Sequence, residues 1–257
     1  MNPRTLFVEG KPRIALDVAG SGPLLVFLHG IGGNRNHWLQ QLRFFSGKFR
    51  AAAWDARGYG ESDDYEGPLR FADFSSDLLR VVDFLKEDMA HVVGLSMGGR
   101  IARNFALKHP ERVRTLTLAN TSPGFDALSP EEVLKFVEER RHRTPESLRR
   151  LVSSRARAGA HDALLNSFHA LRNDSYLKTL EASVSQDRAA PLEKLSMPTL
   201  VITGDEDRVY PAALTRRMAQ RIPDAELVEL EACGHLSNLE QPERFNEVLL
   251  DFLTRRG

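Results

Sequence analysis

The sequence contains one cysteine, Cys233, among 257 residues. A single thiol excludes an intramolecular disulfide, and it leaves too few thiols for a zinc or iron–sulfur site built from cysteines. An excess of charge of either sign is also missing, because 35 Lys and Arg residues balance 35 Asp and Glu residues. This balance argues against a strongly basic nucleic-acid-binding protein, so we expect no nucleic-acid partner.

Long apolar runs are missing as well. No segment approaches the roughly 20 apolar residues that span a bilayer, and the first residues lack the basic and apolar pattern of a signal peptide. We therefore expect a cytoplasmic protein with no membrane partner. Apolar residues still make up 42% of the chain, close to the average of globular proteins, which predicts a well-buried core.

Short apolar segments alternate with helical patterns along most of the chain. The pattern at 71–84 places apolar residues three and four positions apart, which is typical of an amphipathic helix, and 97–109 is predicted as a second helix. The alternation predicts a parallel sheet with helices on both faces, and residues 5–18 are expected to form an antiparallel hairpin at its edge. The segments expected to form buried strands are 24–28, 50–54, 91–95, 113–119, 199–203 and 225–230.

The stretch from residue 122 to residue 190 interrupts this alternation. Its pattern is helical and highly charged, and Pro130 and Pro145 each stand where a helix is expected to begin. We predict an α/β core made of residues 1–121 and 191–257, with a helical cap inserted at 122–190.

The sequence GLSMG at residues 94–98 is the clearest chemical motif. It joins an expected strand to an expected helix, which is the context of a nucleophile elbow. Glycines at both ends permit a very tight turn that leaves Ser96 Oγ exposed at the N-terminus of the helix, where developing negative charge is favoured. The motif predicts Ser96 as a nucleophile, although a plain glycine-rich turn has the same pattern.

Two later residues can supply the groups that a serine nucleophile needs. A hydroxyl requires a base, and His235 lies in a loop after the segment 225–230. The imidazole requires a carboxylate that holds its tautomer, and Asp207 stands where a loop follows the preceding strand. Asp205 is the nearest rival, which we expect to form a turn beside the preceding glycine.

Acyl transfer also needs backbone N–H groups that stabilise the oxyanion. The amide of Met97, directly after the nucleophile, is one candidate. The second candidate is the amide of Ile31 in the sequence HGIGG at 29–33, whose glycines allow the backbone to approach a ligand. For His29 two roles stay open, contact with substrate or a structural hydrogen bond.

Together these motifs resemble the α/β-hydrolase superfamily over nearly the whole chain. The order Ser96, Asp207, His235 is the order of nucleophile, acid and base in that fold. The sequence DARGYGES at 55–62 is typical of small bacterial members, where it is structural. The resemblance implies a serine hydrolase that acts on a small molecule through an acyl-enzyme, needs no metal or organic cofactor, and carries a cap over its active site.

Within the superfamily, the motifs HGIGG, GLSMGG, LANTSPGF and GHLSNLEQPE are most similar to 3-oxoadipate enol-lactonase and related small esterases. This implies an ester or lactone substrate. Carbon–carbon bond hydrolases of aromatic degradation are the first alternative, although they often have Trp after the catalytic histidine, where this chain has Leu236. A lyase or a perhydrolase of the same fold also stays open, as does a ligand sensor without turnover, because a fold does not establish chemistry.

A further group of side chains is predicted to contact the substrate. Trp38 and Phe125 could line the acyl pocket, and Arg100, one turn after the elbow, could bind a substrate carboxylate. Each has a structural alternative, since aromatic residues usually lie in the core and an arginine on a helix is usually solvated or ion-paired. The natural substrate and the oligomeric state are left open by the sequence.

Overall fold

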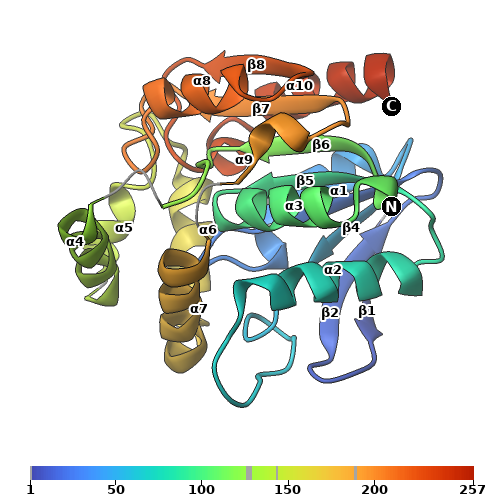
Figure 1. Cartoon of the computed structure of the whole chain (residues 1–257). Coiled ribbons are helices and arrows are strands. Elements are labelled where there is room, and N and C mark those ends of the chain that lie inside the picture. The colour runs from blue at the N-terminus through green and yellow to red at the C-terminus, as the bar shows by residue number, and fades with distance from the viewer. Residues whose placement is uncertain (1, 126–128, 143, 188–189) are drawn as a thin grey trace.

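An eight-stranded sheet forms the centre of the molecule (Figure 1). The computed structural model describes residues 2–125, 129–142, 144–187 and 190–257. The strands, in chain order, are β1 (Arg4–Val8), β2 (Ile14–Ala19), β3 (Leu24–Leu28), β4 (Arg50–Trp54), β5 (Ala90–Leu95), β6 (Val113–Ala119), β7 (Thr199–Gly204) and β8 (Ala225–Leu230).

The sheet has the order β1-β2-β4-β3-β5-β6-β7-β8. From β4 to β8 every neighbouring pair is parallel, whereas β1 and β2 form an antiparallel hairpin that joins the sheet through β4. The six predicted strands and the edge hairpin are confirmed, with ends within one residue of the expected ones at the predicted strands. The fold class predicted from the alternation is therefore correct.

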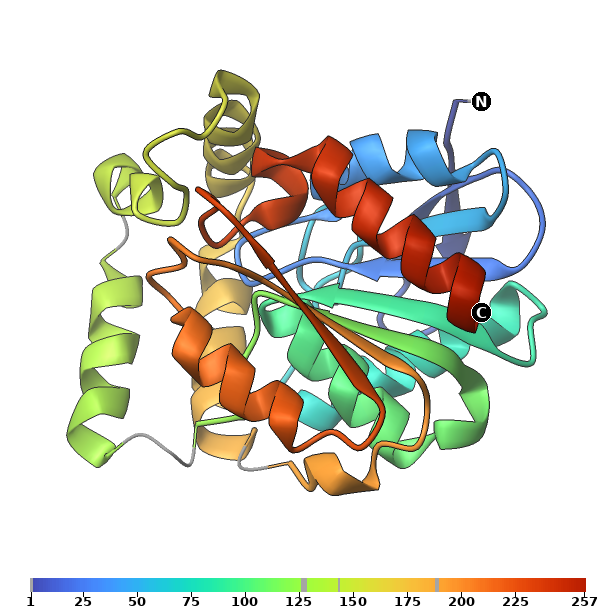
Figure 2. The same ribbon diagram turned by 90° about the horizontal axis from the view of Figure 1, so that it is seen from above.

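Helices cover both faces of the sheet (Figure 2). Helices α1 and α10 pack on one face, and α2, α3 and α8 pack on the other. The helices are α1 (Leu39–Phe45), α2 (Phe71–Phe84), α3 (Met97–Lys108), α4 (Pro130–Arg141), α5 (Pro145–Arg149), α6 (Ala158–His169), α7 (Asn173–Gln186), α8 (Ala212–Gln220), α9 (Ser237–Glu240) and α10 (Pro242–Arg256), with short 3-10 turns at Arg35–Trp38, Pro110–Arg112 and Leu192–Lys194. None of the helices among the described residues is both long and apolar enough to cross a membrane.

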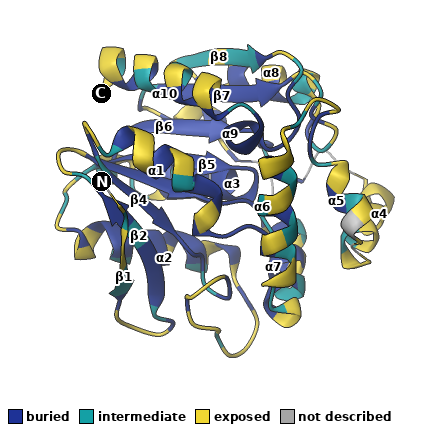
Figure 3. Cartoon of the chain, turned by 180° about the vertical axis from the view of Figure 1, so that it is seen from behind, coloured by how far each residue is buried: buried dark blue, intermediate teal, exposed yellow. Residues whose placement is uncertain are grey.

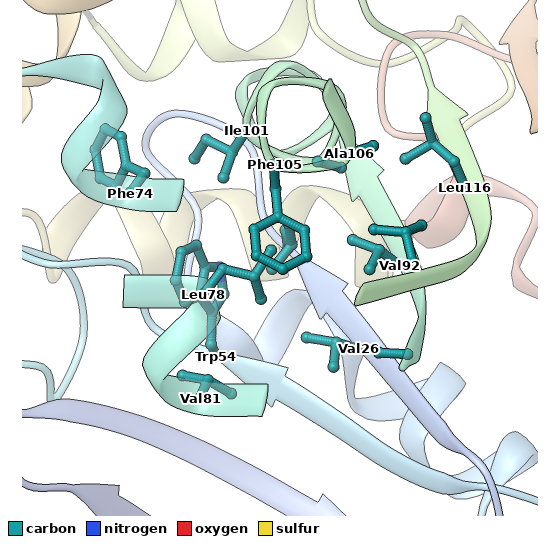
Figure 4. Close-up of a cluster of buried hydrophobic side chains, with 14 of the residues drawn as sticks. Val26, Trp54, Phe74, Leu78, Val81, Val92, Ile101, Phe105, Ala106 and Leu116 are labelled. Atoms are coloured by element: carbon teal, nitrogen blue, oxygen red, sulfur yellow. The ribbon is translucent and has the colours of Figure 1, made fainter. Parts of the chain in front are cut away.

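The central strands are apolar on both faces because both faces are covered. Every residue of β3 and of β5 is buried, and the strands form a dark band through the molecule in Figure 3. Figure 4 shows one face of this core, where Phe105 of α3 lies near Val26 and Val92 of the sheet. This double cover fixes the sheet rigidly and so fixes the loops at the carboxyl ends of its strands.

Strand β8 differs from the other predicted strands because it forms an edge of the sheet. Most of its residues are half-buried, and Glu226 and Glu229 pair with Arg255 and Arg216 on neighbouring helices. The expectation of a strand was correct, but burial on both faces was wrong for β8, because no strand lies beyond it in the described sheet.

In the described part of the chain, helices α4 to α7 stand between β6 and β7 and lie together at one side of the sheet (Figure 1). Pro130 and Pro145 are the first residues of α4 and α5, as predicted, and the residues before them, Ser129 and Thr144, cap these helices. The predicted cap also includes residues 126–128, 143 and 188–189, which lie outside the described part of the chain.

Candidate active site

Ser96 occupies a strained turn between β5 and α3. Its φ of 57° lies in the left-handed region, which non-glycine residues rarely adopt. The turn is fixed to the next strand by the Ser96 N–H, which donates to Ala119 O at 2.9 Å, and by Thr121 Oγ1, which donates to Ser96 O at 2.7 Å. The hydroxyl is therefore presented at the N-terminus of α3 by a backbone that the core holds in place.

The glycines on each side of the elbow are required by space. A Cβ at Gly94 would lie 2.1 Å from Gly98 O, and a Cβ at Gly98 would lie 2.1 Å from Leu28 O. Neither backbone neighbour can move without disturbing the sheet or the first turn of α3. The GxSxG pattern is thus explained by close packing of three backbone segments.

A chain of hydrogen bonds joins Ser96 to the other two predicted catalytic residues. The Ser96 hydroxyl lies 2.9 Å from His235 Nε2, and His235 Nδ1 lies 2.9 Å from Asp207 Oδ2 and 3.1 Å from Oδ1. Because a carboxylate can only accept, Nδ1 carries the proton and Nε2 is free to accept one from the serine. All three side chains are about 5% exposed or less.

Asp207 is held in its charged form. Burial opposes ionisation, but the charge and hydrogen bond of His235, the N–H of Tyr210 and the amide of Asn120 together lower the pKa of Asp207 below its ordinary value. The N–H groups of Val209 and Tyr210 donate to Oδ1 at 2.8 and 3.0 Å. An ionised, fully bonded carboxylate can stabilise an imidazolium that forms next to it.

A cavity opens in front of the Ser96 hydroxyl, between the sheet and helices α4 to α7. Its walls are mostly apolar, with the cations Arg100 and Arg140 among them. Such a surface suits the apolar part of a small ligand, and a few polar groups can fix its orientation. The apolar side chains that line the cavity from the helical segment between β6 and β7 are Phe136, Leu148, Leu151, Leu164, Phe168 and Leu180.

Comparison with known proteins agrees with this geometry. A model of the alpha/beta hydrolase family matches residues 25–248. The chain belongs to the alpha/beta hydrolase family. It is 32% identical to a 2-hydroxy-6-oxononadienedioate/2-hydroxy-6-oxononatrienedioate hydrolase of Paraburkholderia phymatum, over 94% of this chain and 91% of that protein. It is 29% identical to 3-oxoadipate enol-lactonase 2 of Acinetobacter baylyi, over 92% of each chain.

A solved structure supports the same assignment. The thermophilic esterase from Thermogutta terrifontis has a TM-score of 0.88 with this alpha/beta hydrolase at 26% identity, and the similarity covers 98% of each chain. These relatives are hydrolases, and this chain is an enzyme of the same family.

For His29 and Trp38 of this alpha/beta hydrolase, the structure supports the structural alternative and not contact with the substrate. His29 uses both ring nitrogens on the backbone, since Nδ1 lies 2.8 Å from Gly30 O and Nε2 accepts the Ala56 N–H at 3.0 Å. Burial lowers the pKa of His29 to about 4, so the ring is neutral. Trp38 is fully buried and stacks on Phe27 with ring centroids 4.9 Å apart. Neither side chain is among the described residues that line the cavity at Ser96.

Phe125 and Arg100 pack against each other. The Arg100 guanidinium lies 4.6 Å from the centre of the Phe125 ring and pairs with Asp187 at 3.1 Å. Phe125 lines a neighbouring surface pocket, not the cavity at Ser96, so the prediction that it forms the acyl pocket is wrong. Arg100 does line the cavity and shares the carboxylate of Asp187 with Arg103, and its role toward a substrate stays a prediction.

The two predicted oxyanion donors border the cavity. Met97 is the first residue of α3, where a helix leaves its N–H groups without partners inside the helix. Ile31 lies across from it on the loop after β3, and the adjacent Gly30 approaches the Ser96 side chain closely. Their donation to an oxyanion stays a prediction.

Sequence reasoning missed Asn120, Ser237 and Tyr210, which surround the acid and the base. Asn120, fully buried at the end of β6, donates through Nδ2 to Asp207 Oδ2 and to Gly234 O, both at 3.1 Å. Ser237 Oγ donates to Asn120 Oδ1 at 2.6 Å, which fixes the orientation of the amide. Tyr210 packs edge-on against the ring of His235. The polar LANTS end of an otherwise apolar strand was the one signal in the sequence for Asn120.

The single cysteine lies close to this site in the chain but takes no part in it. Cys233 is fully buried, and burial together with nearby carboxylates raises the pKa of its thiol far above the ordinary value. The thiol is therefore protonated and unreactive. Asp205, the rival carboxylate, accepts the Cys233 N–H at 3.2 Å, so it supports the loop that leads to His235.

Proposed function

We propose that this alpha/beta hydrolase cleaves a small carboxylic ester or lactone through an acyl-Ser96 intermediate. The observation that carries the proposal is the continuous chain of hydrogen bonds from Ser96 through His235 to Asp207 at the wall of the cavity. A buried serine with this pair of partners is activated for attack on a carbonyl carbon.

The reaction would proceed in two halves. Ser96 Oγ attacks the carbonyl carbon as its proton passes to His235 Nε2. The oxyanion then accepts hydrogen bonds from the N–H groups of Met97 and Ile31, and each such donor raises the rate by about 10²–10³. His235 then protonates the departing alcohol or enol oxygen, which leaves acyl-Ser96. Water, deprotonated by His235, attacks this ester, and the serine recovers its proton as the carboxylic acid leaves.

We further propose that residues 122–190 act as a cap over the site. The support is that side chains of α4 to α7 form one wall of the cavity, opposite the loop that carries Ile31. A wall of this kind would exclude water and select the acyl group. A cytoplasmic location stays a proposal from the sequence, and cell fractionation of the native host would test it.

Hydrolysis of a carbon–carbon bond is the second candidate. It is favoured by the 32% identity to the dienedioate hydrolase of Paraburkholderia phymatum, since such a substrate carries carboxylates and the cavity has Arg100 and Arg140 in its wall. The same serine, histidine and aspartate could serve either reaction, so only substrates separate the two candidates.

The test compares the wild-type enzyme with Ser96→Ala on p-nitrophenyl esters of short and long acyl chains, an enol-lactone and a vinylogous carbon–carbon substrate. We expect ester or lactone turnover that falls by about 10⁴-fold or more in the variant. Turnover of the carbon–carbon substrate alone would move the assignment to the second candidate. Equal turnover by Ser96→Ala would overturn the nucleophile.

A further inference from the structure

The loop that carries His235 donates three consecutive backbone hydrogen bonds, from the N–H groups of Gly234, His235 and Leu236. Two of them go to the Glu240 side chain at the end of the following helix α9, and one goes to a distant segment of the chain. The Gly234 and Leu236 N–H groups donate to the two carboxylate oxygens of Glu240, at 3.0 and 3.1 Å. The His235 N–H donates to Leu151 O at 2.9 Å, on the segment between α5 and α6.

Glu240 also holds that same segment. Its Oε2 accepts the Ser153 N–H at 2.8 Å, so one carboxylate oxygen bonds both the histidine loop and the proposed cap. The two backbones touch here, because a Cβ at Gly234 would lie 2.5 Å from Ser153 N. Any shift of the 151–154 segment is therefore passed directly to the residue before His235.

The burial of Glu240 makes this arrangement costly to disturb. The residue is 3% exposed, and a buried carboxylate must be bonded to stay charged. Among the described residues, the side chain of Glu240 accepts hydrogen bonds from the backbone N–H groups of Ser153, Gly234 and Leu236. Bonds from N–H to a charged acceptor are about twice as strong as neutral ones, so the position of the main chain around His235 depends on them.

We propose that Glu240 is a positioning residue: it makes the position of His235 relative to Ser96 and Asp207 depend on the position of the 151–154 segment. The inference rests on the proposed role of His235 as the base. It implies that the segment between β6 and β7 does more than select the substrate, because it forms part of the support of the base.

Glu240→Gln tests this with a small change in shape. A glutamine retains one acceptor oxygen, but its NH₂ group must then face an N–H group, so at least one of the three bonds is lost. Glu206→Gln is the matched control, because Glu206 accepts the adjacent Ser154 N–H at 3.3 Å without bonding the N–H groups on either side of His235.

The first measurement is steady-state kinetics on whichever ester the wild type turns over. We expect Glu240→Gln to lower kcat by about 10–100-fold, with KM within about 3-fold of wild type, since a displaced base slows proton transfer more than binding. We expect both kcat and KM of Glu206→Gln to stay within about 2-fold of the wild-type values. Equal kcat values for the two folded variants would overturn the proposal.

The second measurement needs no substrate. The His235 Nδ1 proton, bonded to Asp207, should give a downfield proton NMR signal that shifts or broadens in Glu240→Gln and is retained in Glu206→Gln. An unchanged signal in both variants would overturn the proposal even if the enzyme showed no turnover. If it changed in an inactive enzyme, the proposed function would fail while the positioning role of Glu240 stood.

A third measurement uses the unmodified protein, in case Glu240→Gln does not fold. Hydrogen exchange of the Ser153, Gly234 and Leu236 amides should report one shared opening event, because all three bond the same carboxylate. Exchange of Ser153 about 10-fold or more faster than the other two would mean that the segment unseats without the histidine loop, and the proposal would be wrong.

Discussion

The turn at Ser96 and the loop at His235 are held in different ways. The first is determined by backbone packing, since Gly94 and Gly98 allow a strand, a helix and a neighbouring strand to touch. The second is held by hydrogen bonds. Asn120, directly after β6, and the 151–154 segment are distant in the sequence, and Glu240 lies on the following helix α9.

This difference decides how much of each support can be predicted from the sequence. A turn that depends on steric fit needs glycine at fixed positions, so it is visible as a pentapeptide. The loop at His235 depends on hydrogen bonds instead. Asn120 and Glu240 stand in the motifs LANTSPGF and GHLSNLEQPE, but neither motif shows which group its side chain bonds. The comparison predicts that changes near Ser96 act on folding, and that changes around His235 act on activity first.

The largest effect is expected at the acid. Asp207→Asn leaves the fold intact but removes the charge that fixes the His235 tautomer, and should lower kcat by about 10⁴-fold. Asp205→Asn, which affects only the Cys233 N–H, should lower kcat by less than about 10-fold. The check is kcat of both variants on one p-nitrophenyl ester. The reverse ranking would mean that the wrong carboxylate was assigned.

The next prediction tests whether close backbone packing holds the turn at Ser96. Gly98→Ala places a methyl group against Leu28 O and should lower the free energy of unfolding by about 3 kcal/mol or more. Gly159→Ala, in α6 with nothing within 4 Å of a new Cβ, should instead raise it by about 0.5–1 kcal/mol. Urea denaturation measures both. A Gly98 variant as stable as wild type would show that the elbow can relax.

A smaller effect is expected from the hydrogen bonds around the histidine loop. Asn120→Ala removes one bond to charged Asp207 and one to Gly234 O, and should lower kcat by about 10–100-fold. Asn104→Ala removes a similar side-chain bond, to Asp187 beside Arg103, and should leave kcat within about 2-fold of wild type. Equal kcat values in the two variants would remove Asn120 from the support of the acid.

The smallest effect concerns the strand that leads into the elbow. Burial, with the charge of Arg114 nearby, lowers the pKa of His91 on β5 to about 4. Between about pH 4 and 6.5 the unfolded chain binds a proton at His91 that the folded protein does not, so stability falls as the pH drops through this window. His91→Gln should lower the slope of unfolding free energy against pH by up to about 1.4 kcal/mol per unit. Parallel curves for the two proteins would contradict this.

Most of the fold could be predicted because its signals are local. Apolar segments of five to seven residues and helices with an apolar stripe determine a parallel sheet covered on both faces. The exposure of β8 could not be predicted, since a strand at the edge differs from a central one only in what lies beside it. The order of the strands is likewise set by pairing between distant segments.

The predicted site also has a part that local sequence signals indicate and a part that they do not. Ser96, His235 and Asp207 meet, and Ile31 and Met97 border the same cavity, because parallel strands bring their carboxyl ends to one edge of the sheet. The side chains that line the cavity were harder to predict. Trp38 and Phe125 are the aromatic residues that we expected to line the acyl pocket, yet their rings pack against other aromatic rings. The direction of a side chain depends on the neighbour that it meets.

The sequence by itself determined the fold class, the elbow, and the serine and histidine that come together. These follow from short-range sterics and from periodic burial, which a few consecutive residues encode. Only the tertiary structure decided which carboxylate faces His235, that Asp187 pairs with Arg100 and Arg103, and which residues hold the histidine loop. Each of these depends on hydrogen bonds and charges that act over a few ångströms between segments far apart in the chain, and so on the completed packing.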